Sequence, residues 1–161
     1  MRSRKSVSSL LAPSATKSQT AFIIAIVLGC LWVALGVWAL TAPESFYEIV
    51  APFAPYNQHF VHDLGAFQFG LGTALLLALR FSDALLVALG TNLAAGMAHE
   101  LSHVMDSQLG GHSYDIPNLA LLAALPLLGL VLRSRANGRA TSTATPAPAD
   151  RVAKTNARLS N

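Results

Sequence analysis

Four long apolar stretches, separated by shorter polar segments, dominate the pattern of the chain. We place them at about residues 20–41, 59–79, 84–106 and 116–133. Each stretch approaches the ~20 residues that an α-helix needs to cross the ~30 Å hydrocarbon core of a bilayer. The pattern therefore predicts an all-α fold, a four-transmembrane-helix bundle over residues 20–133 that lies in a lipid bilayer.

The segments outside these stretches are polar or rich in helix breakers. Residues 42–58 contain three prolines and several aromatic side chains, which suit a membrane–water interface. Within them, Pro43 could begin a short helix that Pro52 ends. Residues 1–19 and 134–161 are basic and rich in small or polar residues, and we expect both to be disordered tails.

The charged residues give the bundle an orientation. Only 12% of the residues are charged and 53% are hydrophobic, whereas a soluble domain carries about 25% charged residues. Lys and Arg are concentrated in the two tails, and Arg80 is the one basic side chain other than histidine within residues 20–132. Because cytoplasmic loops retain Lys and Arg, we expect a multi-pass protein of the cell membrane with both termini in the cytoplasm. The absence of a basic face argues against nucleic acid as a partner.

Small residues form stripes on the first two apolar stretches. Gly29 and Gly36 share one helix face, and Gly65, Gln68 and Gly72 share another. In membranes such stripes indicate close helix–helix contact. We therefore expect each of these faces to pack closely against another helix, with Gln68 in an interhelical hydrogen bond.

All five histidines fall at the predicted extracytoplasmic end of the bundle. His62 and Asp63 lie near the start of the second apolar stretch. His99, His103 and Asp106 lie near the end of the third, at helical spacings that put them on one face. Because neighbouring helices run antiparallel, these two groups should reach the same membrane level. We expect a His/Asp/Glu cluster there.

A divalent metal ion is the first candidate ligand for this cluster. Imidazole and carboxylate groups suit zinc or iron, and the candidate ligands are His62, Asp63, His99, His103 and Asp106. Residues 99–103 also read His-Glu-Leu-Ser-His, which matches the HExxH pattern of zinc hydrolases, with Glu100 as the general base. No third histidine follows at the metzincin offset, and four short helices leave little room for a peptide cleft.

Two further interpretations of this cluster stay open. Haem could be held between His62 and His99 or His103, although the neighbouring carboxylates argue against it. Ionisable groups at membrane depth are costly and are candidates for function, but they could also serve only to hold the helices together. The sequence thus predicts an accessory or metal-binding membrane protein with a membrane partner or a second copy of itself. A membrane-embedded enzyme is the alternative.

Two segments resemble a known group of proteins. They are residues 57–72, NQHFVHDLGAFQFGLG, and residues 99–111, HELSHVMDSQLGG. Both resemble segments of small actinobacterial four-helix membrane proteins, which are distantly DoxX-like. The resemblance covers about residues 20–133 and implies a four-helix membrane fold. Some DoxX relatives are associated with respiratory or thiol-redox complexes, so it also implies a redox subunit as one form of the enzyme alternative.

Overall fold

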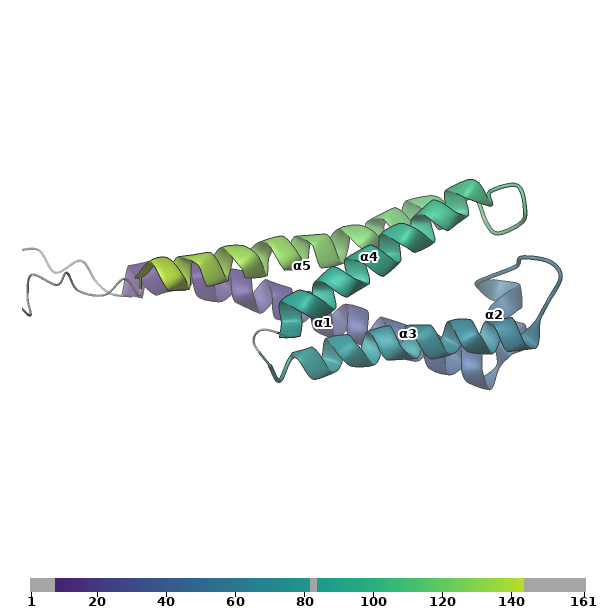
Figure 1. The fold of residues 1–161 in the computed structure, drawn as a ribbon, viewed down its shortest axis with the longest axis horizontal. Helices are drawn as coiled ribbons and strands as arrows, with labels where there is room; N and C mark the ends of the chain where they lie inside the picture. Colours follow the sequence, from purple (N-terminus) through teal and green to yellow (C-terminus); the bar gives the residue numbers. More distant parts are fainter. Residues whose placement is uncertain (1–7, 82–83, 144–161) are drawn as a thin grey trace, which may run out of the picture.

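The computed structural model describes residues 8–81 and 84–143, and it is helical throughout its regular elements (Figure 1). The five helices are α1 (Ser8–Thr41), α2 (Pro43–Ile49), α3 (Gln58–Ala78), α4 (Ala84–Met105) and α5 (Asp115–Thr143). Four of them are long and lie lengthwise along the molecule, and α2 is a short helix at one end. The predicted all-α class is confirmed.

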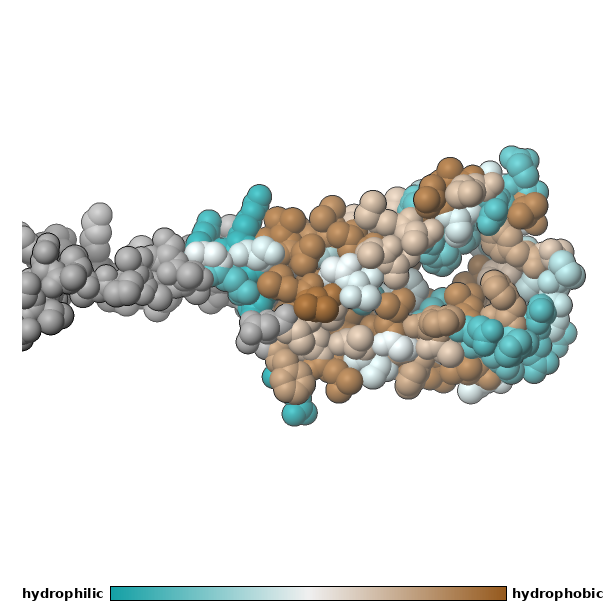
Figure 2. All heavy atoms as spheres, in the orientation of Figure 1, coloured by the Kyte–Doolittle hydropathy of each residue, from teal (hydrophilic) through white to brown (hydrophobic). Residues whose placement is uncertain are grey.

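Four helices are long and apolar enough to cross a membrane. The segments with this property are Gln19–Thr41, Gln58–Ala78, Ala84–Met105 and Asp115–Arg139. Their outward faces are also apolar: Ile23, Leu77 and Val87 are all more than half exposed. Figure 2 shows a largely hydrophobic middle with hydrophilic residues at both ends of the described bundle. An apolar surface of this extent fits hydrocarbon rather than water.

The long helices run further than the sequence predicted. α1 already begins at Ser8 and α5 continues to Thr143, so parts of both expected tails, residues 8–19 and 134–143, are helical. These parts consist mostly of residues that tolerate a helix, and extending a helix costs far less than nucleating one. The remaining predicted tail residues, 1–7 and 144–161, lie outside the described residues.

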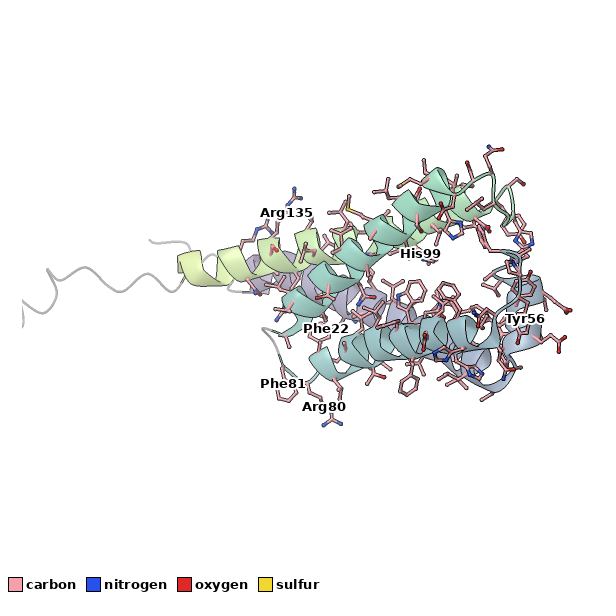
Figure 3. The ribbon with its side chains drawn as sticks, turned by 45° about the vertical axis from the view of Figure 1, so that its right-hand side comes forward. Phe22, Tyr56, Arg80, Phe81, His99 and Arg135 are labelled. Carbon is pink, nitrogen blue, oxygen red and sulfur yellow. The ribbon has the colours of Figure 1, made fainter. Side chains whose placement is uncertain are left out.

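The two ends of the bundle differ in their connections (Figure 1). One end, which we name the tail end, carries the turn from α3 to α4 and the last described turns of α5. The other, the loop end, carries α2 and the connection from α4 to α5. Residues 79–81 and the final turns of α5 bring their arginines to the tail end, where Arg80 and Arg135 are seen in Figure 3.

Glycine allows α1 and α3 to touch backbone to backbone. A Cβ on Gly36 would lie 2.6 Å from the Phe69 nitrogen, and a Cβ on Gly72 would lie 2.7 Å from the Gly29 carbonyl oxygen. Both distances are too short for any side chain. The close helix contact that the glycine stripes predicted is therefore confirmed. The structure adds that the two stripes lie against each other, and we refer to this contact as the α1–α3 seam.

The larger of two core clusters among the described residues lies toward the tail end. Side chains from α1, α3 and α4 form one buried cluster there, which consists of Ile24, Ala25, Leu28, Leu75, Ala78, Leu85, Ala88 and Leu89. α5 packs against α4 and α1. α3 and α4, in contrast, pack sparsely and diverge toward the loop end (Figure 1). The bundle is thus closed at the tail end and splayed at the loop end.

α2 is fixed to the loop end by aromatic side chains. Pro43 occupies its first turn, as predicted. Phe46 is fully buried against Ala39 and Val61, and it meets the Trp38 ring edge-on at 5.6 Å. The Trp38 Nε1 atom donates a hydrogen bond of 2.9 Å to the Ser45 hydroxyl. α2 is therefore packed against the loop end of the α1–α3 pair.

Candidate functional site

A cavity lies at the loop end, between the α1–α3 pair and the α4–α5 pair. The space-filling view in Figure 2 shows the opening between them. The cavity consists of three adjoining hollows of about 370, 270 and 160 Å³. We name them the entrance, middle and inner lobes. His99 and Leu64 line all three lobes. A site of this size and mainly apolar lining is typical of small-molecule pockets.

The entrance lobe joins the start of α3 to the end of α4. Asn57 and Phe60 line it from the α3 side, and Ser102 of α4 and Asp106, which directly follows α4, line it from the other side. The prediction that these two helix ends reach the same level is therefore confirmed. Phe53, from the α2–α3 connection, also lines this lobe.

Two histidines of α4 face each other across one helical turn. The Nε2 atoms of His99 and His103 are 3.2 Å apart, as the i, i+4 spacing predicted. One ring must donate and the other accept for this contact to be a hydrogen bond. Figure 3 shows His99 on the side of α4 that faces the opening. Both rings lie in the lining of the entrance and middle lobes.

Asp115 lies behind the histidine pair. One of its carboxylate oxygens is 3.8 Å from the His103 Nδ1 atom, and the other is 3.7 Å from the His112 Nδ1 atom. The same carboxylate accepts a 2.7 Å hydrogen bond from the His112 backbone N–H. Its position in the first turn of α5 also suits a negative charge. Asp115 thus ties the α4–α5 connection to the cavity wall.

Glycines hold that connection against the α2–α3 connection. Phe53 and Gly110 form an isolated antiparallel β-bridge. Gly111 has a φ of +82°, and a Cβ there would lie 2.7 Å from an Asp115 carboxylate oxygen. Phe53 in turn meets the His103 ring edge-on at 5.4 Å. The α2–α3 and α4–α5 connections therefore contact each other at the loop end, although α3 and α4 diverge there.

The structure brings some of the predicted ligands together and separates others. His99 and His103 adjoin, and Asp106 lines the entrance lobe but is exposed. Asp63 instead pairs with His59 at 3.6 Å on an exposed face of α3, and neither it nor His62 lines the lobes. Among residues 8–81 and 84–143, no group of three or more His, Cys, Asp or Glu side chains is placed to hold one metal ion.

Glu100 lies beside the site rather than in it. It is not part of the lining of the three lobes, although its Oε2 atom is buried and has no hydrogen-bond partner. A helix advances about 100° per residue, so Glu100 cannot share the face of His99. A catalytic role for this carboxylate stays a prediction.

The inner lobe contains two amides whose role the sequence did not reveal. Gln68 and Asn92 are 7% and 5% exposed, and each has a buried carbonyl oxygen without a partner. The interhelical hydrogen bond expected for the Gln68 oxygen is therefore not formed. Amides in an apolar helix were the available signal, but their convergence on one cavity required the fold.

These features define a class: a helical protein with four membrane-length helices and an apolar cavity that carries a histidine pair. No protein-family model, curated protein or solved structure matches the chain. The likeness to DoxX-like proteins stays a prediction.

Proposed function

We propose that this chain is a multi-pass membrane protein that binds a small lipophilic molecule in the cavity at its loop end. The observation that carries the proposal is that three hollows with mainly apolar linings adjoin and share His99 and Leu64. Apolar walls with few polar groups fit a lipophilic molecule that has one polar part. The protein acts in this proposal as a binding or accessory subunit.

The orientation in the membrane belongs to the same proposal. Arg80, Arg133, Arg135 and Arg139 all belong to the tail end. The positive-inside rule then puts the tail end, with both termini, in the cytoplasm of the cell and the cavity on the extracytoplasmic side. In this proposal, the ligand is therefore bound near the extracytoplasmic surface of the membrane.

Tryptophan fluorescence in lipid nanodiscs tests ligand binding. The chain has two tryptophans, and Trp32 lines the inner lobe, so a Trp38→Phe variant keeps the one reporter inside the cavity. A brominated hexylbenzene is then titrated as the quencher. We expect saturable quenching, because the cavity has a limited number of places for the probe.

The matched control fills the cavity. Ala95 lines the inner lobe, so Ala95→Phe in the same single-tryptophan background removes the space and leaves only quenching by probe dissolved in lipid. That residual quenching should rise linearly with probe concentration. Equal, linear quenching in both proteins would show that the cavity does not bind such molecules.

A metal ion is a second candidate, and one distance favours it. Two ligands about 2.0–2.1 Å from a tetrahedral metal ion lie about 3.3 Å apart, and the Nε2 atoms of His99 and His103 are separated by 3.2 Å. Asp115 lies near the other nitrogen of His103, where carboxylates commonly orient a metal-bound histidine. Further ligands would have to come from water or from a bound molecule.

Elemental analysis of the purified chain tests this candidate. We expect stoichiometric zinc or iron that is lost in His99→Ala and in His103→Ala. The control is His59→Ala, because His59 is exposed on α3 and outside the cavity lining. Metal that persists in both α4 variants, or that is absent from the parent protein, would exclude the pair as a metal site. An absorption spectrum of the same preparation tests haem.

A further inference from the structure

Two residues that line the inner lobe from different helices each have a buried carbonyl oxygen without a hydrogen-bond partner among the described residues. The two oxygens are the Gln68 Oε1 atom on α3 and the Asn92 Oδ1 atom on α4. The Asn92 Nδ2 atom donates a 3.1 Å hydrogen bond to the Ala88 carbonyl oxygen. That bond assigns the amide orientation and leaves the carbonyl oxygen as the free acceptor. Leaving a buried acceptor without a partner costs about 1–3 kcal/mol.

The lobe's other walls limit what can satisfy these acceptors. Trp32, Leu64 and Leu71 supply apolar surface, and among the described residues His99 is the one ionisable side chain in the lining. Within residues 8–81 and 84–143, no carboxylate lines the lobe to balance a cationic ligand, and no Lys or Arg lines it to balance an anionic one. Because charge is costly at membrane depth, the matching group is a neutral O–H or N–H donor.

The size of the lobe suggests one ring. Its volume is about 160 Å³, and an apolar cavity of about 150 Å³ is known to hold benzene. Aromatic walls from Trp32 and Phe67 can also pack against a ring, edge-on or offset. A hydroxylated aromatic ring thus satisfies the space, the walls and the acceptors together.

A route from the bilayer to the lobe lies between α3 and α4. A shallow hollow of about 490 Å³ adjoins the inner lobe and shares Phe67, Leu71 and Ala95 with it. Gly70 lines this hollow, and a Cβ there would meet no atom within 4 Å. Phe67 is 75% exposed at the same place. An alkyl tail could therefore remain in the hollow while the ring occupies the lobe.

We infer that the inner lobe binds the hydroxylated ring of a neutral, lipophilic, phenol-like molecule, whose O–H donates to the carbonyl oxygen of Gln68 or Asn92. This inference rests on the proposed function and adds the chemical class of the ligand. The donor group distinguishes it from a general affinity for apolar molecules.

Two matched probes test the role of the donor. Para-hexylphenol carries the O–H, and para-hexylanisole replaces it with a methyl ether of nearly the same shape. Binding of each to the full-length Trp38→Phe protein in nanodiscs is measured from its saturable effect on Trp32 fluorescence, after correction for partition into lipid. We expect the phenol to bind at least tenfold more tightly than the ether.

Substitutions then locate the preference. Asn92→Leu and Gln68→Met remove one acceptor each with little change in volume, and each should reduce the phenol-to-ether ratio several-fold while the ether's affinity is retained. Gln58→Met is the control, because Gln58 is exposed at the start of α3 and outside the lobes. It should leave the ratio unchanged.

The outcomes separate this inference from the function on which it rests. Equal binding of the two probes would overturn donor recognition and leave the lipophilic cavity standing, with water as the partner of the amides. A phenol preference that survives both substitutions would also overturn the inference. Saturable binding of neither probe would overturn both proposals.

Discussion

α3 has two long neighbours in this bundle, α1 and α4, and meets them in opposite ways. Against α1 it forms the α1–α3 seam, in which Gly36 and Gly72 bring the backbones into contact. Against α4 it packs sparsely, and the space between them forms the lobes that Gln68 and His99 line. One helix thus has a filled face and an open face.

The contrast between these two faces of α3 shows where polar groups lie in this apolar bundle. At the seam, the described glycines lie so close to the facing helix that even a Cβ would not fit. The open side gathers the buried amides and the histidine pair, whose hydrogen bonds are incomplete or made to each other. Buried polar groups that lack partners are expected mainly at functional sites. We therefore place the function on the open face.

The same substitution on the two faces should have the most unequal effects. Ala39 is fully buried beside Gly65, so Ala39→Phe should separate α1 from α3 and leave little folded protein. Ala95 lines the cavity, so the ring of Ala95→Phe enters open space, and the variant should fold and avoid most of the ~1–3 kcal/mol that overpacking of a filled core costs. Denaturation in mixed micelles, followed by circular dichroism, measures both. Similar effects of the two changes would contradict the contrast between the faces.

A single methyl group should also distinguish the faces. Gly36→Ala places a Cβ 2.6 Å from the Phe69 nitrogen, and overpacking of this kind costs about 1–3 kcal/mol. Gly70→Ala points into open space and should be neutral or slightly stabilising. The readout is the unfolding free energy of each variant in the same micelles. A neutral Gly36→Ala would mean that the seam is looser than described.

The smallest expected effect concerns the rim of the open face. The Asn57 side chain accepts a 3.2 Å hydrogen bond from the Phe60 backbone N–H and caps α3. Asn57→Ala should lower stability by about 1 kcal/mol, and Asn57→Asp should retain most of the cap. Both are compared by the same unfolding measurement. If Asn57→Asp does not restore the stability, the stability lost in Asn57→Ala comes from the changed lining of the entrance lobe and not from the missing cap.

Much of the fold was predictable from the sequence because membrane-length apolar runs leave few alternatives. The four helices, the short helix at Pro43 and the glycine contacts follow from hydropathy, proline and small-residue spacing. The helix ends were less predictable. α1 begins at Ser8, since a helix can extend beyond the apolar run at little cost.

The site was predictable only within single helices. The spacing of His99 and His103 predicted that they share one face of α4, as they do. His62 and Asp63 of α3 were expected beside them, but neither residue lines the cavity. Their position on the α3 surface depends on how α3 rotates to bury its glycines against α1, and local spacing does not encode that rotation. The splay of α3 from α4, which creates the cavity, is likewise a property of the whole packing. Asp115 reaches His103 through the glycine-containing connection.

Photolabelling tests the central claim most directly. A para-alkylphenol with a diazirine on its tail is irradiated with the full-length protein in nanodiscs, and the labelled residues are identified by mass spectrometry. We predict adducts on Leu64, Phe67 or Leu71, along the cavity and its side opening. Excess para-hexylphenol should prevent this labelling. Labels confined to outward residues such as Ile23 and Val87, or labels that the competitor does not reduce, would contradict the central claim.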